Sequence, residues 1–168
     1  MHPHANDHET TSPAATAPTE RIRVGSDELV FLVPSAATDG ALLAVEVVIP
    51  AGGGPPALHR HAPEEVYRVE RGELAVYLED RAGEVHRHPL CAGGVLHMPS
   101  GRAHTVRNES EEEAVAYVVF TPGAEFERFI RAAADLAAAG PPAMEDVLLL
   151  AASHGVEITG PVPAPSSS

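Results

Sequence analysis

The sequence contains a single cysteine, Cys91, so no internal disulfide can form. A lone cysteine is typical of a reducing compartment, and we expect a cytoplasmic protein in which Cys91 is a small buried residue rather than a nucleophile. No basic segment followed by an apolar run opens the chain, so no signal peptide is predicted. No apolar run reaches the length of a transmembrane helix. These absences exclude a disulfide-bonded scaffold and predict no membrane association.

Basic residues are also few, with 11 Lys and Arg against 24 Asp and Glu, which gives a formal net charge of −13. Such a surface repels nucleic-acid phosphates and anionic lipids, so neither is an expected partner. The charge favours solubility instead. The Ala-, Gly-, Pro- and Arg-rich composition suggests a bacterial source.

The 168 residues are enough for one domain with a sizeable core. The 14 glycines and 16 prolines lie between short apolar runs, a pattern that favours an all-β fold with tight turns. Residues 1–19 lack periodicity and are predicted as a disordered tail. We expect a β-barrel over residues 20–122, a helical extension over 123–158 and a second disordered tail over 159–168.

Short runs rich in Val, Leu and Ile predict eight or nine strands, which is the number expected of a barrel or sandwich. The predicted strands are 21–25, 28–34, 42–49, 65–69, 73–79, 85–90, 95–99, 104–107 and 114–121. Residues 70–73 predict a hairpin turn in which Gly72 takes a positive φ. After Pro122 the apolar spacing becomes helical and predicts one helix ending at Gly140 and a second over 143–154. Both should pack on the barrel or on a partner chain.

A first group of polar residues lies between Gly53 and Gly72. His59-x-His61 follows Gly53 after five residues, Glu65 follows after three more, and Gly72 after a further six. Side chains two apart on an extended segment point to the same side, and Glu65 has the same parity. Two imidazoles and a carboxylate on one face suit Fe, Mn, Co, Ni, Cu or Zn. An isolated His-x-His is more often a surface feature.

Two details limit what this group establishes alone. His86 and His88 show that the same spacing also arises elsewhere in the chain. The neighbouring Glu64 has the opposite parity and should point away from the two imidazoles.

A second group extends from Gly93 to Asn108. Pro99-x-Gly101 follows Gly93 after five residues and predicts a turn between two strands. His104 opens the second of these strands, and Asn108 follows after three residues. Taken alone, His104 would more often be structural than a ligand. His97, just before the turn, is a candidate for a supporting role near the site, although exposure is the expectation for it.

Together the two groups resemble the two motifs of the cupin superfamily, and every fixed position is matched in order. The resemblance implies a double-stranded β-helix, or jelly-roll barrel, followed here by two C-terminal helices. It also implies one divalent transition-metal ion (Fe, Mn, Ni, Co, Cu or Zn) on His59, His61, Glu65 and His104. The wider pattern, including residues 50–74, resembles the quercetin dioxygenase-like bacterial cupins. Since cupins commonly pair, and the helices offer apolar surface, we expect a homodimer.

That resemblance implies a dioxygenase-like oxidoreductase acting on a small enolisable or aromatic substrate, with Glu65 as general base when it leaves the metal. Strand alternation places Tyr67 on the same face as Glu65, and it is the candidate substrate-binding residue. Two alternatives remain open, because fold and ligands do not fix a reaction. One is a metal-dependent isomerase or cyclase that uses the ion as Lewis acid. The other is a non-catalytic metal or small-ligand binder.

Overall fold

The computed structural model describes residues 20–163, which form eleven strands and two α-helices. The strands are β1 Glu20–Val24, β2 Asp27–Val33, β3 Leu43–Ile49, β4 Ala57–Arg60, β5 Glu64–Arg71, β6 Glu73–Glu79, β7 Val85–Cys91, β8 Val95–Met98, β9 His104–Arg107, β10 Ala114–Thr121 and β11 Glu157–Pro161. The helices are α1 Ala124–Ala138, α2 Met144–Ser153 and a short 3₁₀ helix, Ser35–Thr38. The predicted all-β class with two C-terminal helices is confirmed.

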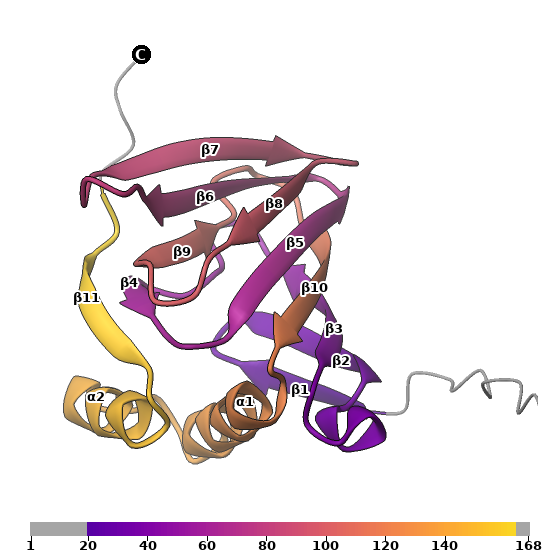
Figure 1. Cartoon of the computed structure of the whole chain (residues 1–168), viewed down its shortest axis with the longest axis vertical. Coiled ribbons are helices and arrows are strands. Elements are labelled where there is room, and N and C mark those ends of the chain that lie inside the picture. The colour runs from indigo at the N-terminus through magenta and orange to yellow at the C-terminus, as the bar shows by residue number, and fades with distance from the viewer. Residues whose placement is uncertain (1–19, 164–168) are drawn as a thin grey trace, which may run out of the picture.

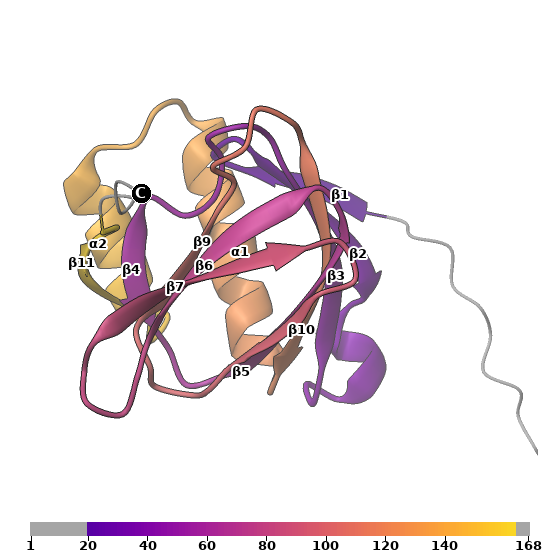
Figure 2. The same ribbon diagram turned by 90° about the horizontal axis from the view of Figure 1, so that it is seen from above.

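Two antiparallel sheets face each other and enclose the core (Figures 1 and 2). The first has the strand order β1-β2-β3-β10-β5-β8 and the second the order β11-β4-β9-β6-β7. Successive side chains of a strand point to opposite faces of its sheet, and on the inner strand β6 both faces are buried, whereas β5 alternates between core and solvent. On β5, for example, Glu65, Tyr67 and Val69 are buried and the residues between them are exposed. The barrel interior is therefore lined by every second residue of its strands.

The predicted hairpin at residues 70–73 is wrong, although its turn residue is correct. Gly72 does have a positive φ of 76°. However, β5 belongs to the first sheet and β6 to the second, and β5 pairs with β10 and β8 instead. A Cβ at position 72 would lie 2.9 Å from the Glu113 carbonyl oxygen. The glycine thus lets the chain turn a tight corner between sheets, which local sequence cannot distinguish from a hairpin.

Two strands were not among the predicted ones. Proline and glycine precede β4, so its four residues form too short a run to be recognised. β11 pairs with β4, and Ile158 lies opposite His59. The boundary predicted at residue 159 is therefore corrected, because residues 159–161 belong to a strand. Residues 1–19 and 164–168, predicted as tails, lie outside the described residues.

The helices lie together at one end of the barrel (Figure 1). α1 packs Phe126 and Ile130 into the core, and the Phe126 ring stacks on Phe120 of β10 with centroids 4.3 Å apart. The predicted helix ends are confirmed, since α1 and α2 finish just before Gly140 and Gly155, both at positive φ. Within residues 20–163, neither helix has the length and apolarity needed to cross a membrane.

The prediction that Cys91 is buried is wrong. Cys91 ends β7, an edge strand of the second sheet, and its side chain is exposed. The preceding Leu90 takes the inward position and is buried. Because successive residues of a strand point to opposite faces, Cys91 has to point outward.

Candidate metal centre

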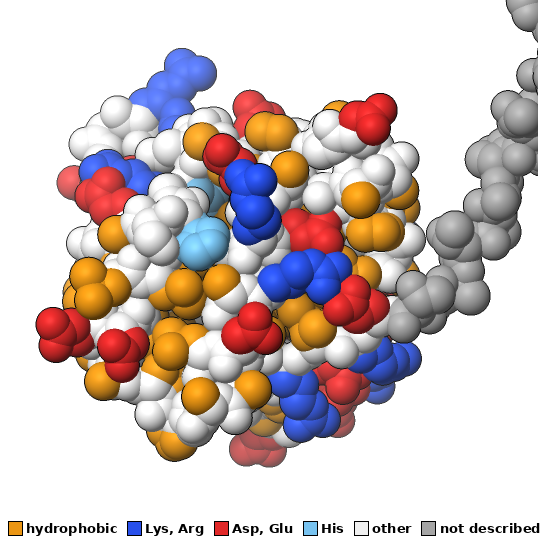
Figure 3. Space-filling model, turned by 90° about the horizontal axis from the view of Figure 1, so that it is seen from below, with side chains coloured by type: hydrophobic (Ala, Val, Ile, Leu, Met, Phe, Trp, Pro, Cys, Tyr) orange, Lys and Arg blue, Asp and Glu red, His pale blue; other side chains and the backbone are white. Residues whose placement is uncertain are grey.

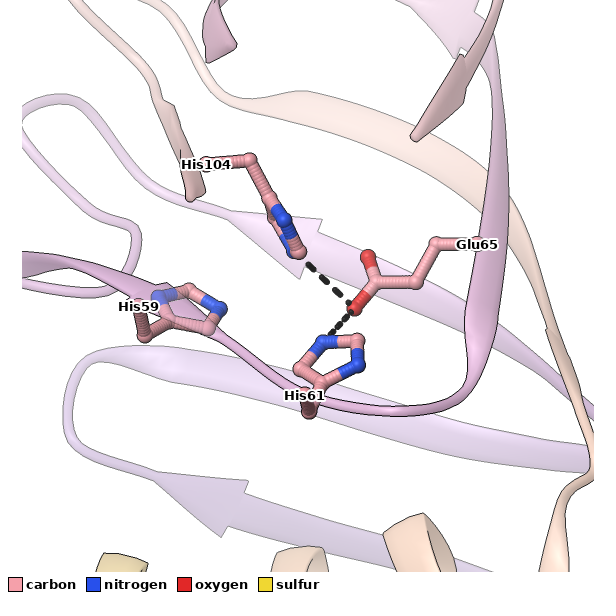
Figure 4. A group of neighbouring side chains, drawn as sticks. All are labelled: His59, His61, Glu65 and His104. Carbon is pink, nitrogen blue, oxygen red and sulfur yellow. Dashed lines mark hydrogen bonds and ion pairs between the residues drawn. The ribbon is translucent and has the colours of Figure 1, made fainter. Parts of the chain in front are cut away.

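Four side chains from three strands converge at the helical end of the barrel interior (Figure 4). His59 lies on β4, His61 just after it, Glu65 on β5, and His104 at the start of β9. His59 and His104 are directly opposite each other in the β4–β9 pairing. Each of the four residues offers one ligand atom, and these atoms all lie within 4.8 Å of one another. The structure thus brings together all four ligands predicted from the sequence.

Each of the three imidazoles is oriented by a backbone carbonyl group. The Nδ1 contacts are 3.1 Å from His59 to the Ala57 oxygen, 2.9 Å from His61 to the Pro63 oxygen and 2.8 Å from His104 to the Arg102 oxygen. A carbonyl oxygen can only accept a hydrogen bond, so Nδ1 must carry the proton in each ring. In a neutral imidazole the lone pair is then on Nε2, which faces the centre of the group. The same arrangement orients histidine ligands in metalloproteins.

The atoms that face one another at the centre are mostly hydrogen-bond acceptors. His61 Nε2 lies 2.6 Å from Glu65 Oε1, and His104 Nε2 lies 3.4 Å from the same oxygen. Despite that short distance, the buried His61 Nε2 has no well-directed hydrogen bond to any described residue. Nitrogen lone pairs and a carboxylate this close require a shared cation, either a proton or a metal ion. Imidazole and carboxylate groups are suitable ligands for a divalent transition metal, so the residues fit such an ion.

Burial and neighbouring charges set the ionisation of these side chains. Burial lowers the pKa of His59 to about 4, and His104 adds to this effect, so His59 is neutral at physiological pH. Burial alone would raise the pKa of Glu65, but His104 and His61 outweigh it and hold that pKa well below the usual range. Burial lowers and Glu65 raises the pKa of His104, and the net shift is upward. Glu65 therefore stays ionised, as metal binding requires.

Tyr67, the predicted substrate-binding residue, lies on the same face of β5 as Glu65 and is buried in the barrel core. Burial raises its pKa well above 10, and the negative charges of Glu65 and Asp27 add to that shift. The hydroxyl is therefore neutral at any physiological pH. Its role toward a substrate stays a prediction.

Glu64 and His97 lie outside the centre. Glu64 is exposed, as its parity predicted, and His97 Nε2 lies 3.0 Å from its Oε2. The two residues form a surface pair on β5 and β8 that makes no contact with the four converging side chains. The expected exposure of His97 is confirmed.

One residue of the site was not identified from the sequence. Phe126 of α1 lies over the His61 ring, with centroids 4.6 Å apart. Helical spacing indicated that Phe126 belongs to an apolar helix face. The helical spacing does not, however, indicate that this face packs against His61, which lies more than sixty positions earlier in the sequence.

Comparison with protein families identifies the fold. The cupin domain family model matches residues 45–120, which include both motifs and all four converging residues. Residues 45–120 form a cupin domain. The two sheets form the predicted jelly-roll barrel, and similar solved structures include other cupins. An RmlC-like cupin from Shewanella frigidimarina has a TM-score of 0.53 at 22% identity, over 65% of this chain and 88% of that one.

Two further solved structures resemble this cupin. A protein from Thermotoga maritima described as a predicted oxalate decarboxylase has a TM-score of 0.52 at 26% identity, over 61% of this chain and 90% of that one. An oxalate decarboxylase of Lactobacillus farciminis, in a formate complex, has a TM-score of 0.53 at 22% identity, over 61% of this chain and 30% of that one. The likeness to the Lactobacillus farciminis enzyme concerns the fold alone.

A curated relative is auxin-binding protein 1 of Arabidopsis thaliana, which is 31% identical over 75 residues. The match covers 42% of this chain and spans only 38% of the length of that relative.

Proposed function

We propose that this cupin is a metal-dependent oxidoreductase of the dioxygenase type, acting on a small enolisable or aromatic substrate. The observation that carries the proposal is the convergence of three Nε2 atoms and one carboxylate inside the barrel. Four protein ligands leave part of an octahedral coordination shell for a substrate. When bound, the ion would supply Lewis acidity and, if it is redox-active, the capacity for chemistry with O2.

The protein residues would hold the ion and exclude water. His59, His61 and His104 would bind through Nε2, because each Nδ1 is held by a carbonyl group. The surroundings are apolar: Phe126 covers His61, and the fully buried Met98 lies opposite Glu65 in the β5–β8 pairing. Such walls suit the planar, weakly polar body of an aromatic or enolic molecule.

Glu65 is the candidate general base. In its present contacts with His61 and His104, its pKa is held well below the usual range, and such a carboxylate is a poor proton acceptor. Rotation away from these partners would remove their stabilising effect and leave a buried carboxylate, whose affinity for a proton is higher. Glu65 could then take a proton from the substrate onto Oε1.

The test begins with protein purified without nickel resin, stripped of metal and reconstituted separately with Fe²⁺, Mn²⁺, Co²⁺, Ni²⁺ or Cu²⁺. Uptake of O2 is measured with flavonols and 1,3-diketones. We expect substrate-dependent uptake with at least one metal, and a loss of at least about 100-fold in Glu65→Gln. His97→Ala, at the exposed pair with Glu64, is the matched control and should keep full activity.

Binding assays on the same preparations separate the alternatives. Oxalate and auxin join the panel because a similar structure is described as a predicted oxalate decarboxylase and a relative as auxin-binding. If O2 uptake is absent with every metal while a ligand binds, the dioxygenase proposal fails and a Lewis-acid enzyme or a binding protein replaces it. If no metal is retained at all, the ligand assignment fails as well.

A further inference from the structure

A surface cleft of about 340 Å³ lies between the two helices. It is lined by Glu125 and Arg128 of α1 and by residues 153–155 at the end of α2. Figure 3 shows the molecule from the side on which the helices lie, with apolar side chains exposed between charged ones. The cleft is mixed in charge, since Arg128 lies 3.8 Å from Glu125. It is thus a polar hollow on the surface, at the end of the barrel where the four side chains converge.

A continuous line of aromatic rings connects this cleft to the candidate metal centre. His154, which lines the cleft, lies 6.0 Å from Phe129 between ring centroids. Phe129 lies 5.6 Å from Phe126, and Phe126 lies 4.6 Å from His61. Phe129 and Phe126 thus form a chain of ring contacts from His154 at the cleft to the predicted ligand His61.

The centre itself is closed in this conformation. None of the four converging residues is more than 8% exposed, and Phe126 is buried to the same extent. A substrate therefore needs a side chain to move before it can reach the ligands. Phe129 is only partly buried, so the Phe126 ring has a less tightly packed neighbour on the cleft side.

The rest of α1 is fixed independently of these rings. Glu127 accepts a hydrogen bond from the Ser35 backbone amide at 2.6 Å, and Arg131 pairs with Glu20 of β1 at 2.7 Å. These contacts do not involve the Phe126 ring, so a rotamer change of that ring would not require the helix to move, and rotamer changes are fast compared with helix undocking.

From this arrangement we infer that the cleft between α1 and α2 is the entrance to the metal centre, and that Phe126 is the gate between them. The inference rests on the proposed function, since it requires a metal on the four ligands. It assigns to the C-terminal helices the role of controlling access, in addition to covering the barrel end. The gate passes molecules according to their size, because it is a single aromatic ring rather than a charged group.

The test measures the rate at which two chelators of different size, dipicolinate and EDTA, remove Co²⁺ from the loaded protein, followed by visible absorption. In the wild type we expect the bulkier EDTA to act more slowly. Phe126→Ala should accelerate removal by EDTA at least about tenfold and largely abolish the size difference. Phe126→Leu should give an intermediate rate. Val95→Ala, at an exposed position of β8, is the control and should match the wild type.

The outcomes are distinguishable. A general loss of stability would accelerate both chelators equally, so Leu74→Ala, which alters a buried core residue of β6 away from α1, provides the comparison. If wild type and Phe126→Ala bind Co²⁺ but keep the same EDTA to dipicolinate ratio, the gate is refuted and the metal site stands. If the wild type binds no Co²⁺, the metal site itself is refuted.

Discussion

At the scale of single residues, the centre depends on the tautomer of its histidines. Each Nδ1 proton is held by a carbonyl group two positions away in the chain. Extended backbone near each histidine makes this contact local, so the sequence neighbourhood that supplies a ligand also orients it. The convergence of the Nε2 atoms, by contrast, depends on strands that are distant in sequence.

His61→Ala and His104→Ala should each abolish metal retention without unfolding the barrel. Either change leaves three ligands that no longer enclose the ion, and we expect affinity to fall by at least about 100-fold. Metal content is measured by elemental analysis and folding by circular dichroism, with His86→Ala on the exposed face of β7 as control. Metal content at the wild-type level in either variant would contradict the assignment.

Asn108, the last position of the second motif, has a structural role. It is fully buried, and its Nδ2 donates to the Ile49 and Glu112 carbonyl oxygens at 2.8 and 2.7 Å. Its Oδ1 accepts from the Ser110 amide and hydroxyl. One amide side chain thus fixes the loop that follows β9 against the end of β3.

Asn108→Ala should lower the free energy of unfolding by about 2–4 kcal/mol, because it leaves buried backbone groups unpaired. Urea denaturation followed by fluorescence of the tyrosines measures the change. Ser110→Ala removes only the hydroxyl contacts and should cost less. Equal stabilities of the wild type and Asn108→Ala would show that water satisfies the same groups.

At the scale of elements, α1 is attached by an ionic cluster as well as by its apolar face. Glu127 bonds to Ser35 and to Arg131, and Arg131 also pairs with Glu20 and lies 4.4 Å from the centroid of the Phe31 ring. Burial alone would raise the pKa of Glu127, but the hydrogen bond from Ser35 and the Arg131 charge outweigh it, so the pKa is lowered. The ionised form is therefore the one that fixes the helix.

The stabilisation from Glu127 should consequently depend on pH. A carboxylate with a lowered pKa in the folded state stabilises above its unfolded pKa of about 4.3, and this contribution is lost as the pH falls through the folded value. The stability difference between wild type and Glu127→Gln should thus shrink as the pH falls below about 4.3. Urea denaturation at several pH values measures it. Glu125→Gln, at an exposed position of the same helix, is the control for removing one carboxylate charge from α1.

At the scale of the whole molecule, the net charge of −13 accompanies a local apolar surface on α2. Met144, Leu148 and Leu149 are all exposed there, Met144 and Leu149 to 64%. Exposed apolar side chains gathered on one short helix are typical of an interface between subunits. The surface supports the expected homodimer, which stays a prediction.

Light scattering should therefore give the mass of a dimer for the full chain, and Leu148→Glu with Leu149→Glu should give a monomer. The acidic pair would have to be buried without partners in the interface, which costs several kcal/mol. Val95→Glu, exposed on β8, is the control for added charge and should remain a dimer. A monomeric wild type would refute the prediction.

From the sequence alone came the alternation of the strands and the ends of the helices, and the resemblance to the two cupin motifs gave the four candidate ligands. Alternation and helix ends depend on contacts within a few residues: side-chain parity, and glycines such as Gly140 and Gly155 that take a positive φ. Only the tertiary structure decided that the chain turns between sheets at Gly72, that β11 pairs with β4, and that Phe126 covers His61. Each of these requires knowing which distant segments meet when the barrel closes, and a local pattern carries no information about its distant partner.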